Sequence, residues 1–298
     1  MAIDQLQERL RQHSADRTPI GLLNLEEDAA IISFVPEDMT VKVAAGLTLS
    51  KLQAELAQAG QWLPLDPAGE SVTIKQIIDG NLYGPRRYGY GAIREHLIGM
   101  EMLLADGRLV QSGGNVVKNV AGYDLMKLFV GARQSLGIVA NATFKLQPLL
   151  ERTAILKRPC RDSVEVAEIT DRLMNSEVCP VILDWFRVDE GVAVSLCTAF
   201  AGTNAEVDWQ LQEIAGLGFT EMDGTDYQRS QPAVKSTIKP SSLRELVDEL
   251  GNAPFVARAG NGVMWSERPL GQPSRRPRDL ERRLKETFDP LGLLPRLD

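Results

Sequence analysis

The chain has 298 residues, of which 44% are hydrophobic and 24% are charged, so it can bury one large core or two moderate ones. Its 40 acidic and 33 basic side chains give a formal net charge of −7, which argues against a surface made for nucleic acid. The three cysteines, Cys160, Cys179 and Cys197, are too far apart for a disulfide framework, a metal site or an iron–sulfur motif. These features predict a reduced, cytoplasmic compartment.

The N-terminal stretch, residues 1–17, reads as a polar helix without the apolar centre of a signal peptide. No uninterrupted apolar run in the sequence approaches the roughly 18 residues that a membrane span needs. We therefore expect no direct membrane insertion. Any association with the inner membrane would run through a partner.

In the first half of the chain, glycine-rich turns separate helical and extended patterns. Thr48 or Ser50 is available as the N-cap of a helix with apolar residues at helical spacing, and Asp106-Gly107 is a hairpin turn between two apolar runs. The pattern predicts, in chain order, a helix over 49–59, a strand over 96–104 with its return strand from 109, a helix from 122 and a strand over 137–146.

Glycines become much rarer after Gln147-Pro148, and we place a domain boundary there. A turn at 189–191 lies between two apolar strands and forbids a purely parallel sheet, so the second part is predicted to be α+β with an antiparallel sheet. Its predicted elements are strands over 153–157, 181–188, 192–197 and 255–258, and helices around 166–173, 207–214, 243–250 and 280–288.

Residue types alone offer little catalytic chemistry. The sequence has only two histidines, His13 and His96, and we expect the first to be solvated and the second to be structural. A P-loop and a G-x-G-x-x-G fingerprint are both missing from the sequence. The sequence therefore predicts no metal site, and it leaves the catalytic residues unassigned.

Four turns rich in glycine and small residues follow one another between Trp62 and Gly137. Such turns let backbone amides approach a ligand closely, but any α/β domain also needs turn glycines, and both explanations stay open at this point. The four segments are 63–67 (Leu-Pro-Leu-Asp-Pro), 79–87 (Asp-Gly-Asn-Leu-Tyr-Gly-Pro-Arg-Arg), 118–125 (Lys-Asn-Val-Ala-Gly-Tyr-Asp-Leu) and 131–139 (Gly-Ala-Arg-Gln-Ser-Leu-Gly-Ile-Val).

In this order and spacing, the four segments resemble the FAD-binding domain of vanillyl-alcohol-oxidase-type (PCMH-type) flavoproteins. Among these, the FAD-binding subunits of bacterial glycolate oxidase carry strings similar to 84–87 and 118–125. The resemblance extends over about 39–148, less clearly over 153–221, and weakly to the Asp-Pro-x-Gly ending at 289–292. It implies a two-part FAD-binding domain with an inserted α+β cap. The expected parts are 1–148 (FAD-binding type), 149–252 (cap) and 253–298 (returning to the FAD-binding domain).

The resemblance also implies which residues face the cofactor. An ADP group needs amide donors and little side-chain bulk beside its phosphates. The residues carried over are Pro64, Asp66 and Pro67 beside the flavin or ribityl chain; Gly80, Gly84 and Arg86 along the pyrophosphate and ring; Asn119, Ala121, Gly122 and Tyr123 next to the flavin; and Gly131, Gly137, Ile138 and Val139 at the adenine end.

The activity implied by the resemblance is that of an FAD-linked subunit of a glycolate-oxidase-like 2-hydroxy-acid dehydrogenase. Such a subunit would pass electrons from flavin to an iron–sulfur partner, beside a larger FAD-binding subunit. Two departures from relatives favour an alternative, a non-catalytic scaffold subunit of the same complex that has lost tight FAD binding. The phosphate loop is missing around residues 18–35, and Lys75-Gln76 replaces a Gly-Gly pair, although the charge of Lys75 could instead support phosphate binding. Residues 260–263 also lack the histidine of relatives, and with it the obvious base for proton abstraction from a 2-hydroxy acid.

Arginines gather near the C-terminus, at positions 268, 275, 276, 278, 282 and 283. A nucleic-acid module could be argued from them alone. A solvated, partner-facing helix explains the cluster more simply in an acidic protein.

Overall fold

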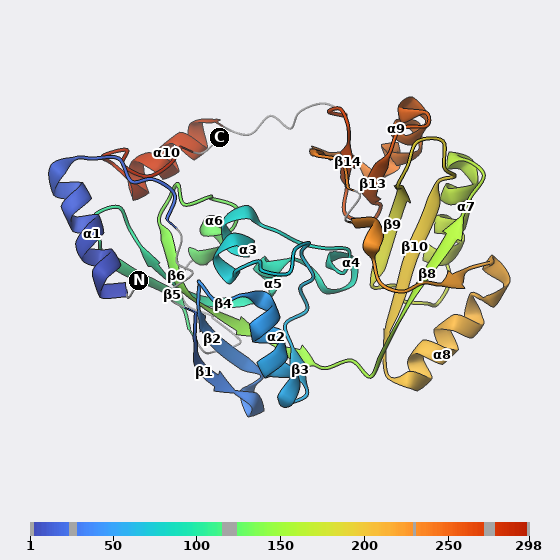
Figure 1. Ribbon diagram of the computed structural model, residues 1–298, viewed down its shortest axis with the longest axis horizontal. Coiled ribbons are helices and arrows are strands. Elements are labelled where there is room, and N and C mark those ends of the chain that lie inside the picture. Colours follow the sequence, from blue (N-terminus) through green and yellow to red (C-terminus); the bar gives the residue numbers. More distant parts are fainter. Residues whose placement is uncertain (1–2, 24–28, 115–123, 229–230, 271–277, 297–298) are drawn as a thin grey trace. The chain divides into compact units, whose positions relative to one another are not determined.

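The computed structural model describes residues 3–23, 29–114, 124–228, 231–270 and 278–296. The chain divides into two compact units (Figure 1). Unit 1 comprises Met1–Tyr83, Ala92–Leu149 and Arg276–Asp298, and unit 2 comprises Gly84–Gly91 and Leu150–Arg275. Each unit has its own sheet and its own hydrophobic core.

Unit 1 is built on a five-stranded antiparallel sheet. Its strands, in spatial order, are β1 (Ile31–Val35), β2 (Thr40–Ala44), β6 (Ile138–Lys145), β4 (Leu97–Leu103) and β5 (Leu109–Gly113). Two short strands, β3 (Gln61–Trp62) and β7 (Gln147–Pro148), pair separately. The predicted hairpin between β4 and β5 is confirmed, because Leu104 N–H donates to the carbonyl of Arg108 across the Asp106-Gly107 turn.

Helices of unit 1 pack on the sheet through apolar faces. They are α1 (Ile3–Asp16), α2 (Leu49–Gln58), α3 (Ile74–Gly80), α5 (Ile93–His96), α6 (Met126–Phe129) and α10 (Arg278–Phe288), with a 3-10 turn at Pro36–Asp38. Leu52 and Leu56 of α2 and Ile77 of α3 join one core with sheet residues, while α1 contributes to a separate cluster with Leu103. Thr48 caps α2 as expected, accepting a hydrogen bond from Lys51 N–H.

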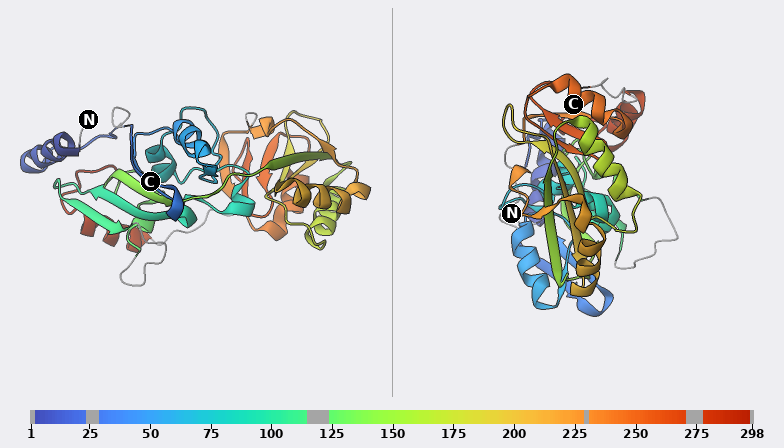
Figure 2. Two further views of the ribbon diagram at one scale, coloured as in Figure 1. Left: turned by 90° about the horizontal axis from the view of Figure 1, so that it is seen from below. Right: turned by 90° about the vertical axis from the view of Figure 1, so that its right-hand side faces the viewer.

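Unit 2 contains a seven-stranded antiparallel sheet. In spatial order its strands are β11 (Thr220–Glu221), β8 (Arg152–Pro159), β10 (Ser195–Gly202), β9 (Ile182–Arg187), β13 (Phe255–Arg258), β14 (Val263–Ser266) and β12 (Val234–Thr237). Its helices are α4 (Arg87–Tyr90), α7 (Ser163–Met174), α8 (Asn204–Glu213) and α9 (Leu243–Leu250), with 3-10 turns at Ala215–Leu217, Asp226–Gln228 and Pro240–Ser242. Residues of α7 and α9 pack on one face of this sheet, and Figure 2 shows the unit from two further sides.

The α+β class with an antiparallel second sheet is confirmed. Two parts of the chain lie in another unit than the expected division gives, which assigned all of 1–148 and of 253–298 to the first unit. Gly84–Gly91 belongs to unit 2. Strand β13 pairs with β9 and β14 pairs with β13, so these two strands complete the sheet of unit 2. The segment assigned to unit 1 begins instead at Arg276.

The face of the second sheet opposite α7 and α9 carries a fully buried ion pair. Arg258 on β13 lies directly across from Asp184 on β9, and the two side chains form a salt bridge at 1% exposure each. Tyr227 donates its hydroxyl to Asp184 at 2.6 Å and stacks on Phe186. Burial raises the pKa of the Asp184 carboxyl, and the neighbouring Arg258 guanidinium opposes that shift. The pair joins two neighbouring strands of unit 2.

The C-terminal segment is fixed to unit 1 by one lysine and one aspartate. Lys285 Nζ donates to the Asp289 carboxylate at 2.7 Å and to the carbonyls of Ser135, Leu294 and Pro295. The same carboxylate accepts the N–H groups of Leu293 and Leu294. The Asp-Pro-x-Gly ending is therefore a folded turn built around a fully buried aspartate side chain.

We predict that Asp289→Asn lowers the free energy of unfolding by about 2 to 4 kcal/mol, because it removes the charge of a buried pair and one strong acceptor. Asp279→Asn is the matched control, since the Asp279 side chain is 94% exposed and its loss should change stability little. Urea denaturation followed by circular dichroism measures both. Equal stability of the two variants would contradict the assignment.

Candidate functional site

The predicted cofactor residues fall into three groups in the structure. Gly84 and Arg86 belong to unit 2, while the other described candidates belong to unit 1. The group Asn119, Ala121, Gly122 and Tyr123 lies outside the described residues. The candidate residues that the structure describes within unit 1 therefore lie in the segments 64–67 and 131–139 and at Gly80.

The segment that carries Pro64, Asp66 and Pro67 follows β3, and a side chain of α2 fixes its start. Gln53 of α2 accepts the N–H of Leu63 at 3.0 Å and donates its side-chain amide to the Leu63 carbonyl at 2.5 Å. Pro64 is buried, while Asp66 and Pro67 are half-buried. The Gln53 side chain thus bonds both backbone groups of Leu63, as a neighbouring strand would, and fixes the position of the chain just before Pro64.

The structure brings the Gly80 turn and the Gly131 turn together. Gly131 N–H donates to the carbonyl of Ile78 at 2.8 Å, and Arg133 N–H donates to the carbonyl of Asp79 at 3.1 Å. A Cβ on Gly131 would meet only the Asn81 Cβ, at 3.5 Å, but its φ of +85° favours glycine. These two candidate segments are neighbours through hydrogen bonds of their own backbones.

Gly137, at the entrance to β6, has a packing reason to be glycine. A Cβ there would lie 2.9 Å from the carbonyl oxygen of Leu103 and 2.9 Å from the Phe129 ring. The next two candidates, Ile138 and Val139, are buried strand residues. Each of these residues has a structural role that needs no ligand.

The first turn of α3 stands where relatives are expected to carry the Gly-Gly pair. The helix begins with a capping box, in which Gln76 N–H donates to Thr73 Oγ1 and the Gln76 side chain accepts Thr73 N–H. Ile74 N–H donates to the carbonyl of Leu47 at 2.9 Å, and Lys75 N–H donates to that of Ala45 at 2.7 Å. All of the N–H groups that normally remain free at a helix start are therefore used within the chain.

A buried polar network adjoins this turn. Lys75, one turn before Asp79 on α3, forms a salt bridge with it at side-chain exposures of 5% and 13%. Gln134 hydrogen-bonds Asp79 with its side chain and also bonds the backbone N–H and carbonyl of Leu23. Burial lowers the pKa of the Lys75 ammonium and raises that of the Asp79 carboxyl, and the attraction between the two groups opposes both shifts.

The donors at α3 do not fit a diphosphate. A diphosphate is held by free backbone amides and cationic side chains. Here the amides of the first turn already donate within the chain, and the Lys75 ammonium is paired with the Asp79 carboxylate. A phosphate at this turn would have to displace those internal bonds and would face the Asp79 carboxylate.

The segment that lacks the expected histidine, 260–263, is also closely packed. A Cβ on Gly260 would lie 2.0 Å from the Tyr88 ring, and one on Gly262 would lie 2.6 Å from the carbonyl oxygen of Ile238. The two histidines do not supply a substitute. His13 bonds Thr18 on the surface, and His96 is 2% exposed in unit 1, as the sequence predicts.

The C-terminal arginines that the structure describes are divided between the two units. Arg268 pairs with Glu249 in unit 2, and Arg282 of α10 pairs with Glu286. Arg275 and Arg276 lie outside the described residues. Local acidic partners thus neutralise part of the expected basic face.

Comparison with known proteins shows which fold this chain shares and which family model part of it matches. Residues 11–113 match the family model of an FAD binding domain. Among solved structures, an alkyldihydroxyacetonephosphate synthase superposes with a TM-score of 0.77 at 13% sequence identity, covering 97% of this chain and 74% of that one. The chain therefore has the PCMH-type FAD-binding fold, and FAD is the cofactor of the matching family, as the sequence predicts.

Individual relatives show which FAD-linked proteins this chain resembles. Glycolate oxidase subunit GlcE of Escherichia coli (strain K12) is 24% identical over 97% of this chain and 94% of the relative. Subunit GlcD of Bacillus subtilis (strain 168) is 34% identical, and D-lactate dehydrogenase of Archaeoglobus fulgidus is 35% identical. The chain spans only 33% and 26% of the lengths of these last two. The resemblance to FAD-linked oxidoreductases, and to glycolate oxidase subunits among them, is confirmed.

None of the described helices is both long and apolar enough to cross a membrane. Within the same residues, no group of three or more histidine, cysteine or acidic side chains could hold a metal ion.

The polar network around α3 was not predicted from the sequence. Lys75 and Gln76 stood out only because they replace a Gly-Gly pair, and no partners were expected for them. The spacing of Lys75 and Asp79, one helical turn apart, is the signal that could have revealed the pair. No such signal exists for Gln134, which reaches the network from a turn more than fifty residues away.

We predict that Gly137→Ala lowers the free energy of unfolding by about 1 to 3 kcal/mol, because a methyl group there overpacks the end of β4. The loss should be equal with and without added FAD. Gly21→Ala is the control, since nothing lies within 4 Å of a Cβ at that position. Thermal melting of both variants, with and without FAD, is the measurement. A Gly137→Ala variant that melts like the unaltered chain but no longer responds to FAD would show a cofactor-facing role instead.

Proposed function

We propose that this chain is a subunit of a glycolate-oxidase-like complex that oxidises a small 2-hydroxy acid. The observation that carries the proposal is the similarity to subunit GlcE, which extends over nearly the full length of both chains. The matching fold of unit 1 supports it. The expected partners are a larger FAD-binding subunit and an iron–sulfur subunit, and the expected place of work is the cytoplasm, with any contact to the inner membrane made by partners.

Two roles within such a complex are open to the chain. In the first, unit 1 holds FAD along the candidate residues, unit 2 serves as the cap, and electrons pass from flavin to the iron–sulfur subunit. In the second, the chain is a non-catalytic scaffold that has lost tight FAD binding. The internal use of the α3 donors and the Lys75–Asp79 pair favour the second role.

We predict that the isolated chain binds FAD with a dissociation constant weaker than about 1 µM. Each charge-assisted hydrogen bond to the diphosphate that is missing removes roughly 1.5 to 3 kcal/mol, so several missing bonds remove many decades of affinity. Calorimetric titration with FAD and the visible absorption spectrum after desalting measure this. Nanomolar binding, or a flavin spectrum that survives desalting, would favour the electron-passing role.

We also predict that tagged chain, expressed in its own host, co-purifies with a larger flavoprotein and an iron–sulfur protein. The chain has no cluster-ligand motif in its sequence, so electron transfer beyond flavin requires a partner. Native mass spectrometry at two salt concentrations tests the assembly. A chain that remains monomeric at both would rule out the complex, whatever its affinity for FAD.

A further inference from the structure

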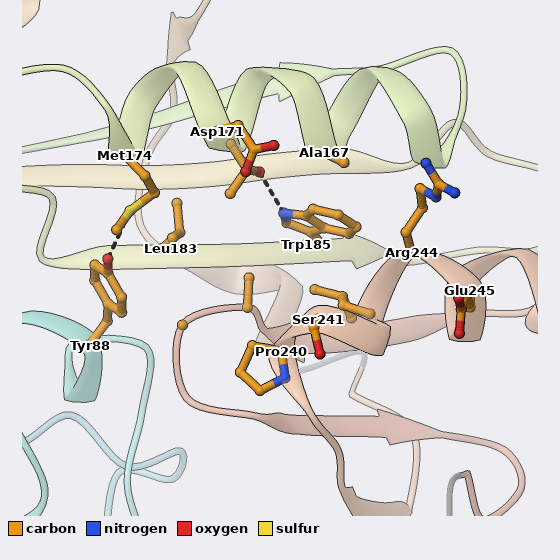
Figure 3. A pocket seen from close by; sticks show the side chains of 14 residues that line it. Tyr88, Ala167, Asp171, Met174, Leu183, Trp185, Pro240, Ser241, Arg244 and Glu245 are labelled. Carbon is orange, nitrogen blue, oxygen red and sulfur yellow. Dashed lines mark hydrogen bonds between the residues drawn. The ribbon is translucent and has the colours of Figure 1, made fainter.

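Unit 2 contains a pocket, and none of the residues that line it is among the candidate cofactor residues. A pocket of about 490 Å³ opens between α7, the turn that leads into α9, and Tyr88 of α4 (Figure 3). This volume is within the range of small-molecule sites. All of the lining residues belong to unit 2.

The floor and one end of the pocket are apolar. Leu183 and Trp185 of β9 form the floor together with Ala259. The polar atom of the indole is already satisfied, because Trp185 Nε1 donates to Thr170 Oγ1 at 2.8 Å. At one end of the pocket the Tyr88 hydroxyl donates to the sulfur of Met174 at 2.9 Å. These walls therefore offer mainly hydrocarbon to a ligand.

Small residues keep the pocket from being filled by the protein itself. Elsewhere α7 packs on the sheet with Val166, Ile169 and Leu173. On the pocket side the same helix presents Ala167 and Thr170, and the facing wall has Gly260. Interiors of proteins are close-packed as a rule, so small residues opposite an indole leave a space suited to another molecule.

The rim of the pocket carries charges of both signs. Arg244 on α9 and Asp171 on α7 are exposed, and the side chain of neither has a hydrogen-bond or ion-pair partner among the residues that the structure describes. Figure 3 places Arg244 near the Ala167 end of α7 and Asp171 nearer to Met174. Glu245, also on the rim, makes a simple anion an unsuitable occupant, because the acidic side chains outnumber the arginine.

We propose that this pocket binds a free α-amino acid with an apolar side chain. Arg244 would take the carboxylate and Asp171 the ammonium group, while the side chain would lie over Trp185 and Leu183. A zwitterion of this kind pairs both unpartnered charges at once, and its side chain uses the apolar floor. The inference does not depend on FAD or on assembly with other subunits.

L-Phenylalanine is the probe, titrated into the purified full chain and followed by ligand-observed NMR. Arg244→Gln and Asp171→Asn should each weaken its binding by about tenfold or more, since each removes one charge-assisted contact. The matched controls are Arg172→Gln and Glu168→Gln, exposed residues of α7 that do not line the pocket. Both should bind the probe like the unaltered chain.

A third variant, Ala167→Leu, tests the cavity. Its larger side chain should fill the pocket and abolish the binding of L-phenylalanine, while the melting temperature of the chain stays unchanged. Phenylpropionate and phenethylamine, which carry one charge each, should bind at least tenfold more weakly than the amino acid. The proposal is overturned if L-phenylalanine does not bind at millimolar concentration, if either analogue binds as well, or if the rim variants bind like their controls. The flavin and assembly measurements are unaffected by any of these results.

Discussion

The first turn of α3 is held by hydrogen bonds within unit 1 at the place where a helix could otherwise bind an anion. A helix start normally leaves several backbone N–H groups free, and these groups make it an anion site. In this chain they donate to the carbonyls of Ala45 and Leu47 and to the cap residue Thr73. The helix is thereby attached to the segment that follows β2, and its positive end faces protein instead of an anion.

The neighbouring Lys75–Asp79 ion pair adds further polar bonds within unit 1. Lys75 and Asp79 neutralise each other, and Gln134 ties Asp79 to the backbone of Leu23. Three stretches of chain, around residues 23, 75–79 and 131–134, are thus held together by polar bonds within the protein. These bonds complete the polar contacts of α3 within the protein itself.

The sequence predicted those elements whose signals are local. The helix at α2 has its cap Thr48 and apolar spacing, the β4–β5 hairpin has Asp106-Gly107, and α9 and β13 were predicted with the bounds observed. Strand β14 was missed, because its place in the second sheet depends on pairing with β13 and β12. Gly131 and Gly137 were interpreted through a resemblance. The positive φ angle of Gly131 and the packing of Gly137 against Leu103 depend on the three-dimensional structure and have no signal in the sequence.

Hydrogen exchange of the α3 backbone amides tests the central claim most directly. The account predicts that the N–H groups of Lys75 and Gln76 exchange slowly in the chain purified without cofactor, and that added FAD leaves their rates unchanged, because both groups already donate within the protein. Fast exchange without FAD, followed by strong protection when FAD is added, would contradict it and would make this helix start a phosphate site after all.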